Sequence, residues 1–290
     1  MSNTGQILRS ILPEQVRSTI RNQIDNLEFR VFQWRSKGHP TLKEPIFLIG
    51  CPRSGTTIGV RLFATHPWVA NWSELGHIWD PTNYYDPDAE HYWNADMVTE
   101  QAARRLHARF EYYRHKSGKP RFINKHPRNS VRIDYMREIF PDAFFIHLIR
   151  DGRAVVNSII TQTPRKPTRQ GIPFANFCKP PNWRQFLRDD PVEQAALQWR
   201  EIVGYVLGKR SELGDRYHEF KYEDMCSTPR EVFASAFEFA GLPVSDAFLS
   251  GIPERLENRN FKYEEKFSQA QLDTINTIQK DLLQELGYKV

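Results

Sequence analysis

A loop near the start of the chain combines residue types that could hold a phosphate group. It reads Gly50-Cys51-Pro52-Arg53-Ser54-Gly55-Thr56-Thr57 and follows the apolar run Pro45–Ile49. At a junction between a strand and a helix, the backbone N–H groups of such a turn point at one anion. The spacing is that of a Walker A loop, but Thr56 stands where that loop has its lysine. Because this lysine neutralises the β- and γ-phosphates of a nucleotide, its absence argues against transfer of a γ-phosphoryl group.

A less charged anion suits this loop better. A 5′-phosphosulfate carries less negative charge than a triphosphate, and Arg53 with the hydroxyls of Ser54, Thr56 and Thr57 could hold it without a metal ion. A glycine turn that binds no ligand is the alternative for the loop taken alone.

A second candidate anion site lies in the segment Leu148–Ser158, after a later apolar run. Arg150 would leave the end of a buried strand with its guanidinium free for bidentate contact with phosphate. Ser158 would lie on the following helix, whose positive end faces the same anion. Two phosphate sites in this order, each at a strand–helix junction, disfavour a simple Arg–Asp pair beside a helix cap.

Together the two motifs resemble those of the sulfotransferases that use 3′-phosphoadenosine-5′-phosphosulfate (PAPS). Cys51–Thr57 is similar to the loop for the 5′-phosphosulfate, and Leu148–Ser158 is similar to the 3′-phosphate motif of that family. The resemblance covers roughly residues 45–290 and is closest in spacing to the tyrosylprotein and bacterial branch. It implies PAPS as donor, 3′-phosphoadenosine-5′-phosphate (PAP) as product and no required metal ion. The donor-binding residues that it implies are Arg53, Ser54, Gly55, Thr56, Thr57, Arg150, Ser158 and Tyr222.

Two residues are candidates for the base that sulfuryl transfer needs. Glu74 lies 21 residues after Arg53, the spacing at which the tyrosylprotein branch has its catalytic glutamate. A carboxylate with an ordinary pKa of about 4.3 is a weak base unless burial raises that pKa, and we expect Trp72 and Trp79 to bury it. His126 is the alternative, because the steroid and phenol branch has a histidine at a similar place and imidazole needs no pKa adjustment near neutrality. We rank Glu74 ahead of His126.

Two cations complete the expected catalytic set. Lys125 ends a predicted strand, and the resemblance places a lysine there on the bridging oxygen of the donor. With Arg53 it would neutralise charge on the transferring group. Tyr222 also follows a predicted strand, where the family often has a tyrosine near the adenine, although a purely structural tyrosine is the alternative.

The surrounding pattern predicts an α/β fold in three layers, α/β/α, with a central parallel sheet, a P-loop-like phosphate loop and a helical C-terminal half. Strands are expected at 45–50, 121–125 and 143–149, with helices from the loop to about Thr65, over 129–140 and from Gly152. Thr228-Pro229-Arg230-Glu231 and Ser268-Gln269-Ala270-Gln271 each have the pattern of a capping box.

We divide the chain into an N-terminal helical extension, residues 1–40, and a single domain, residues 41–290. In the extension, apolar residues at helical spacing predict a peripheral helix that packs on the domain, with a membrane-surface or partner-binding helix as the alternative; these residues are Val16, Ile20, Ile24, Leu27 and Val31. Residues 76–95 and 161–192 lack periodicity, and segments of this kind commonly form lids. They would supply the acceptor pocket.

Composition limits which ligands and which cellular location the sequence predicts. The 290 residues carry a formal net charge of +5, which suits an anionic ligand, but the basic residues are too dispersed to indicate nucleic-acid binding. No apolar run is long enough to span a membrane and no signal-peptide core is present, so we expect a cytoplasmic location. Peripheral membrane contact and the oligomeric state are left open. Cys51, Cys178 and Cys226 are too scattered for a zinc site or a disulfide framework, and Cys51 is expected to pack in the tight turn.

We therefore expect an enzyme that moves a sulfuryl group from PAPS, by in-line displacement, to a hydroxyl or amine of a carbohydrate, a lipid or a small metabolite. Two other classes of function remain. One is a P-loop kinase or nucleotide hydrolase, and the other is a protein that binds PAP or PAPS without turnover.

Overall fold

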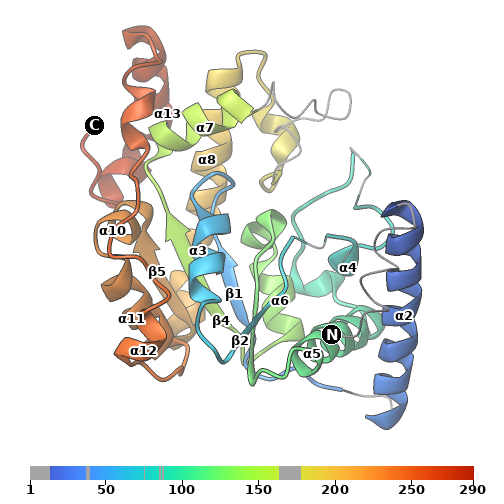
Figure 1. Ribbon diagram of the computed structural model, residues 1–290. Helices are drawn as coiled ribbons and strands as arrows, with labels where there is room; N and C mark the ends of the chain where they lie inside the picture. Colours follow the sequence, from blue (N-terminus) through green and yellow to red (C-terminus); the bar gives the residue numbers. More distant parts are fainter. Residues whose placement is uncertain (1–13, 37–39, 75, 85, 87, 163–177) are drawn as a thin grey trace.

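A five-stranded parallel sheet forms the centre of the molecule (Figure 1). The computed structural model describes residues 14–36, 40–74, 76–84, 86, 88–162 and 178–290, and the side chains from residue 23 onward. The strand order is β2-β3-β1-β4-β5. The strands are β1 (Ile46–Ile49), β2 (Val69–Asn71), β3 (Arg121–Asn124), β4 (Phe144–Ile149) and β5 (Tyr217–Lys221).

Strand β1 shows why the sheet is covered on both faces. All four of its residues are buried, and alternate side chains of a strand point to opposite faces. Ile46 and Leu48 pack into one apolar cluster, whereas Phe47 and Ile49 pack into another. A parallel sheet with two apolar faces needs a helical layer on each, so the predicted α/β/α architecture is confirmed.

Helices from both halves of the chain form the two layers. One face is covered by α3 (Thr56–Phe63), α10 (Tyr222–Ser227) and α11 (Pro229–Phe239). The other is covered by α5 (Glu100–Lys116), α6 (Ile133–Ile139) and α8 (Pro191–Gly208). Helices α7 (Gly152–Gln162) and α13 (Gln269–Glu285) pack against α8.

Short helical segments connect these elements. They are α4 (Gly76–Trp79), α9 (Arg210–Leu213), α12 (Asp246–Leu249) and the 3₁₀ helices η1 (Ala95–Met97), η2 (Pro127–Val131), η4 (Trp183–Phe186), η5 (Gly214–Arg216) and η6 (Asn260–Tyr263). The helix expected over 129–140 is therefore two elements, because the chain first forms the 3₁₀ helix η2 and becomes α-helical only from Ile133.

The two predicted capping boxes have different outcomes. Ser268 forms the complete box with Gln271 at the start of α13. Thr228 precedes Pro229 at the start of α11, but its side chain makes no capping hydrogen bond. The prediction of a capping box at Thr228 is therefore wrong. The backbone of Thr228 has ψ of 58°, outside the extended conformation from which an N-cap side chain usually reaches the first turn.

Helix α2 (Glu14–Arg35) lies at the edge of the molecule against α5 (Figure 1). Its contact is partly aromatic, with the rings of Phe29 and Tyr112 centred 5.4 Å apart, and partly ionic, with Lys116 paired with Asp25 and Glu28. Of the apolar residues predicted to pack on the domain, Ile24, Leu27 and Val31 are exposed, so that part of the prediction is wrong. The side chains of Val16 and Ile20 lie outside the described part of the chain. In the described part of the chain, no helix combines the length and the apolar character that crossing a membrane requires.

Candidate active site

The candidate site residues gather where the carboxyl ends of the strands meet the following loops. Strand β1 lies at the middle of the sheet, and the chain first continues to the β2–β3 side and then crosses to the β4–β5 side. In an open α/β sheet, the reversal of direction leaves a crevice beside the carboxyl ends of the central strands. The loops after β1, β3, β4 and β5 therefore carry Arg53, Lys125, Arg150 and Tyr222 to one region.

The loop after β1 is closely packed on its neighbours. Gly55 has φ of 95°, and a Cβ atom there would lie 2.7 Å from the ring of Tyr222, so only glycine fits. Cys51 is fully buried, and burial raises the pKa of its thiol well above the usual value. Cys51 is therefore a packing residue with a protonated thiol, as the sequence predicts.

Ser54 leaves a polar atom of this loop unused. Its side chain is fully buried, and its Oγ has no hydrogen-bond partner among the described residues. Buried hydroxyls are rarely left without a partner. A phosphate or sulfate oxygen would supply the partner, so the loop fits the anionic group that its sequence predicts.

Two guanidinium groups and a hydroxyl meet on the β4 side of the loop. Arg53 Nε donates to Ser158 Oγ at 3.1 Å, and Arg150 Nη1 donates to the Arg53 carbonyl at 3.0 Å. Burial lowers the pKa of both arginines, and the charge of Arg150 lowers the pKa of Arg53 further. Neither arginine forms an ion pair within the described ranges. Two like charges held together in this way favour an anion between them.

Arg150 is held by Tyr222, which the sequence indicated for the site, and by Asn260, which the site prediction did not include. Its Nε donates to Asn260 Oδ1 at 2.9 Å, and its guanidinium lies 4.2 Å from the centre of the Tyr222 ring. Asn260 in turn donates to a carboxylate oxygen of Glu223 at 2.5 Å, and Tyr288 donates to the other oxygen at 2.9 Å. These contacts hold the guanidinium in one orientation.

A second group lies on the β3 side of the loop. Lys125 Nζ forms an ion pair with Glu74 and donates to Thr57 Oγ1 at 3.0 Å. The Glu74 backbone N–H donates to the Lys125 carbonyl at 2.8 Å, so the segment after β2 runs beside the end of β3. The Lys125 side chain is only 4% exposed, and its burial lowers its pKa, although the pair with Glu74 opposes this change.

The expected burial of Glu74 is wrong. Its side chain is 55% exposed. Trp79 instead packs in the core, with its ring 5.3 Å from that of Phe110, and Trp72 stacks on Tyr113. The two tryptophans turn toward α5, so the aromatic neighbours in sequence are not neighbours of the carboxylate.

His126 is close to Lys125 but is committed to the backbone. Its Nδ1 accepts the Arg128 backbone N–H at 3.2 Å and so caps η2. Burial lowers the pKa of His126 well below the usual value, and the charges of Arg132, Arg128 and Lys125 lower it further. The ring is therefore neutral at neutral pH.

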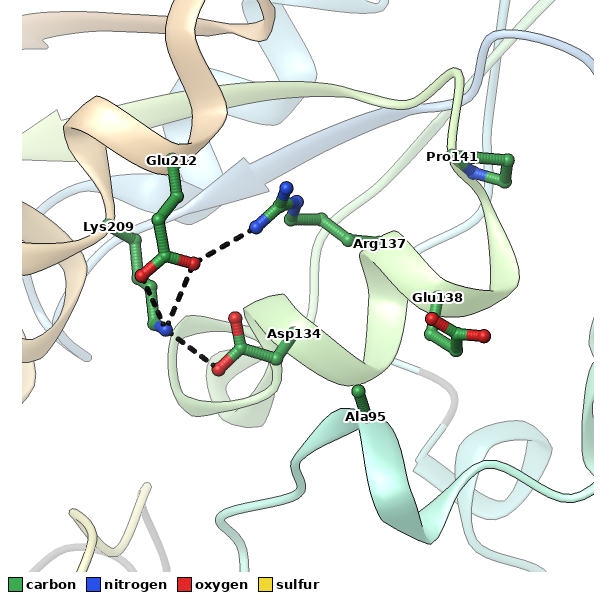
Figure 2. Close-up of a pocket in the computed structure, with 7 residues that line it drawn as sticks. All are labelled: Ala95, Asp134, Arg137, Glu138, Pro141, Lys209 and Glu212. Carbon is green, nitrogen blue, oxygen red and sulfur yellow. Dashed lines mark hydrogen bonds and ion pairs between the residues drawn. The ribbon is translucent and has the colours of Figure 1, made fainter.

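A polar pocket of about 420 Å³ lies away from this crevice, near the start of β4 (Figure 2). Lys209 Nζ lies between the carboxylates of Asp134 and Glu212, at 2.9 and 3.0 Å. The charges of Lys209, Asp134, Glu212 and Arg137 are therefore paired within the chain. The lining residues are Ala95, Asp134, Arg137, Glu138, Pro141, Lys209 and Glu212. Within the described ranges, no group of three or more His, Cys, Asp or Glu side chains could hold a metal ion.

Comparison with known proteins identifies the family. The model of the sulfotransferase family matches residues 45–246. The chain belongs to the sulfotransferase family. The match includes both candidate anion-binding motifs, Glu74 and Lys125, and the resemblance of the sequence to this family is confirmed.

The sequence identity between this chain and individual relatives is low. Protein-tyrosine sulfotransferase A of Caenorhabditis elegans is 28% identical over 213 residues, which cover 70% of this chain and 51% of that protein. An uncharacterized protein of Aquifex aeolicus is 27% identical over 235 residues, 74% of this chain and 28% of that protein. The chain thus spans about half or less of the length of these relatives. The solved structure of a sulfotransferase from Mycobacterium avium has a TM-score of 0.56 at 15% sequence identity. The alignment covers 91% of this chain and 82% of that chain, so the two proteins share the fold.

Proposed function

We propose that this sulfotransferase moves the sulfuryl group of PAPS to a hydroxyl or amine of an acceptor. One observation carries the proposal. The loop Gly50–Thr57 joins a pair of unneutralised arginines, Arg53 and Arg150, to the Glu74–Lys125 pair in a single crevice. PAPS carries two matching anionic groups, a phosphate at the 3′ position and a phosphosulfate at the 5′ position of one adenosine.

We assign the donor's two anionic ends to the two groups. Arg150 and Ser158, with Arg53 beside them, would bind the 3′-phosphate. The backbone N–H groups of Gly55, Thr56 and Thr57 and the unpartnered Ser54 hydroxyl would bind the 5′-phosphosulfate. Tyr222 packs against both Gly55 and Arg150, so we assign it to the adenosine between the two ends.

The transfer step needs a base and a group that stabilises the leaving oxygen. PAPS supplies an activated sulfuryl group. Glu74 would take the proton of the acceptor hydroxyl while the acceptor oxygen bonds to sulfur and the bond between sulfur and the bridging oxygen breaks. The electron pair of that bond stays on the bridging oxygen, where Lys125 stabilises the negative charge. The products are the sulfated acceptor and PAP.

We assign Arg53 to both groups. Its Nε bonds Ser158, whereas its charge is felt by Lys125 on the other side of the loop. Its guanidinium would therefore neutralise charge at the 3′-phosphate and at the transferring group. We prefer Glu74 to His126 as the base because Glu74 is exposed at the crevice and the His126 ring caps η2.

Calorimetry with PAP and with ATP plus magnesium tests the donor assignment. We expect PAP to bind, ATP with magnesium to bind weakly, and Arg150→Ala to weaken PAP at least about 10-fold, as expected for loss of a charge-assisted bidentate contact. Arg200→Ala, which removes a surface arginine paired with Glu201, is the matched control. Binding of ATP with magnesium but not PAP would favour a nucleotide kinase or hydrolase.

Incubation of the protein with PAPS labelled in the sulfuryl group and a metabolite extract tests turnover. We expect one or a few compounds to acquire the label, and Lys125→Ala to abolish labelling while PAP still binds. If PAP bound and no compound were labelled, the chain would be a PAP-binding protein without turnover. The kind of acceptor and the cytoplasmic location remain predictions.

A further inference from the structure

Two buried arginines beside the proposed active site have no anionic partner among the described side chains. Arg128 is 9% exposed and Arg132 is fully buried. They lie in and directly after η2, the 3₁₀ helix that follows Lys125 and His126. Neither forms an ion pair with a carboxylate in the described part of the chain. Burying a guanidinium without an anion is costly, because its charge loses the solvation of water.

Most of their hydrogen-bonding capacity is unused. A guanidinium has five N–H donors. Arg132 Nε donates to the His91 carbonyl at 2.9 Å, and Arg128 Nη2 donates to the Tyr84 carbonyl at 3.0 Å. Nη1 and Nη2 of Arg132 and Nη1 of Arg128 have no partner among the described residues.

Aromatic rings cover the planar faces of the two guanidinium groups, but several N–H groups at their edges have no hydrogen-bond acceptor among the described residues. The Arg132 Cζ atom lies 3.3 Å from the centre of the Trp93 ring, and the Arg128 Cζ atom lies 4.5 Å from that of Tyr84. Stacking on an aromatic ring stabilises a guanidinium through its face. The N–H groups in the plane of the guanidinium still require acceptors.

The charge around the pair is positive. Burial lowers the pKa of Arg132 to about 9, and the charge of Arg128 contributes to this change. Lys179 lies near enough for Arg128 to lower its pKa as well. Asp80 is the acidic side chain whose charge reaches both arginines, but its Oδ1 accepts the Asn83 backbone N–H instead.

Outside the described side chains, the sequence offers one carboxylate, that of Glu14 at the start of α2, the helix at the edge of the molecule against α5 (Figure 1). Residues 1–13, 37–39, 75, 85, 87 and 163–177 contain no aspartate or glutamate. An anion that does not belong to this chain is therefore the simplest partner for the pair.

The pair lies next to the reacting groups. His126 feels the charges of Arg132, Arg128 and Lys125. Arg128 follows Lys125 by three residues, a separation that spans at most about 11 Å of backbone. A substrate of ordinary size could therefore reach both Glu74 and the arginine pair.

We propose that Arg128 and Arg132 form a binding site for an anionic group, a carboxylate or a phosphate or sulfate ester, carried by the acceptor that this enzyme sulfates. This inference rests on the proposed function and narrows the class of acceptor. The acceptor would be a small anionic molecule that carries both the charged group and the hydroxyl or amine that is sulfated. The site is separate from the donor site of Arg53, Arg150 and Ser158.

Matched pairs of hydroxyl compounds test the site in protein saturated with PAP. The pairs are 4-hydroxyphenylacetate with 4-hydroxyphenylacetamide, 6-hydroxyhexanoate with its amide, and glucuronate with glucuronamide, at constant ionic strength. We expect the charged member of at least one pair to raise Tm by about 3 °C more than its amide at about ten times its Kd. Arg128→Gln should remove this difference, and Arg128→Lys should retain part of it.

Controls separate this inference from the proposed function and from effects on folding. Arg104→Gln, which removes an exposed arginine paired with Glu100 on α5, should retain the full difference. The increase of Tm by PAP alone reports the donor site and should persist in Arg128→Gln. If PAP raises Tm but no charged probe exceeds its amide in the wild type, the anionic-acceptor site is refuted while the donor assignment stands.

Inorganic phosphate distinguishes an acceptor group from a free ion. If phosphate alone raised Tm through Arg128 and no charged organic probe did so, the pair would hold a free anion, and the acceptor assignment would be wrong. If Arg128→Gln retained the preference for the charged probes, the anion would bind elsewhere.

Discussion

Glu74 and Lys125 restrain each other in the ligand-free chain. The carboxylate is exposed and the ammonium is buried, yet each is the other's ion-pair partner. Under the proposed mechanism, Glu74 would be a better base once Lys125 has another anion to bind, and the bridging oxygen of the donor would be that anion. The order of events would follow from this pair, because donor binding would draw Lys125 away and leave the carboxylate available as a base.

The pH dependence of turnover should report Lys125. Its burial lowers its pKa below the usual 10.5, so the ammonium is lost as pH rises through that lowered value. Activity that needs the charge should therefore fall on the alkaline side at a pH below 10.5. In Lys125→Arg the guanidinium stays protonated, so this fall should move to higher pH even if kcat at neutral pH is reduced. The measurement is kcat/KM for PAPS from pH 6 to about 10.5 with the acceptor found by labelling, because this ratio reports the pKa values of the free enzyme. An alkaline limb at the same pH in both proteins would exclude Lys125 as its source.

Glu74→Gln and His126→Asn distinguish the two candidate bases. We expect Glu74→Gln to lower kcat roughly 100-fold or more, the usual loss for a general base, with Kd for PAP nearly unchanged. His126→Asn should chiefly lower the free energy of unfolding, because the ring caps η2 and fills a buried place beside Tyr84. Single-turnover rates and urea unfolding give the two quantities. The reverse pattern, a large loss of kcat in His126→Asn alone, would make His126 the base.

At the scale of elements, the sequence predicts which segments are helices better than which face of a helix is buried. The helix Glu14–Arg35 exists, but it meets α5 through Phe29 while Ile24, Leu27 and Val31 face outward. The periodicity predicts the helix because apolar residues on one face of a helix recur about every 3.6 residues. It does not show which neighbour the helix will pack against, since that depends on the tertiary arrangement of α5.

Ser268→Ala and Thr228→Ala compare a capping box that forms with one that does not. Both side chains are exposed and begin helices of the C-terminal half. Ser268→Ala should lower the free energy of unfolding by about 1 kcal/mol, because the Ser268 hydroxyl accepts the Gln271 backbone N–H. Thr228→Ala should change it by less than about 0.5 kcal/mol, since no capping bond is lost. Urea unfolding measures both changes in the free energy of unfolding. Equal losses in the two variants would show that the sequence pattern alone, and not the capping hydrogen bond, determines the loss of stability.

At the scale of the molecule, the sequence predicts the anchors of the site but not the contacts between them. The loop Gly50–Thr57 and Arg150 could be found because each motif is local and follows an apolar run. The contacts of Arg53 with Ser158 and of Asn260 with Arg150 join positions far apart in the chain. They depend on the strand order, which brings the carboxyl ends of β1 and β4 together. The unneutralised pair of Arg128 and Arg132 was not predicted, since local sequence does not show which side chains are buried.

Donor binding should stabilise the molecule as a whole, because the proposed contacts tie together the loops that follow β1 and β4 and the start of α10. At 100 times its Kd, PAP should stabilise the folded chain by about 2.7 kcal/mol, which corresponds to an increase in Tm of roughly 4 to 5 °C for a chain of 290 residues. Adenosine 5′-phosphate lacks the 3′-phosphate, so at the same concentration it should raise Tm much less. In Arg150→Ala the two nucleotides should become nearly equal, because the side chain that distinguishes them is gone. Differential scanning calorimetry measures all four combinations, and an equal increase with both nucleotides in the wild type would contradict a 3′-phosphate site at Arg150 and Ser158.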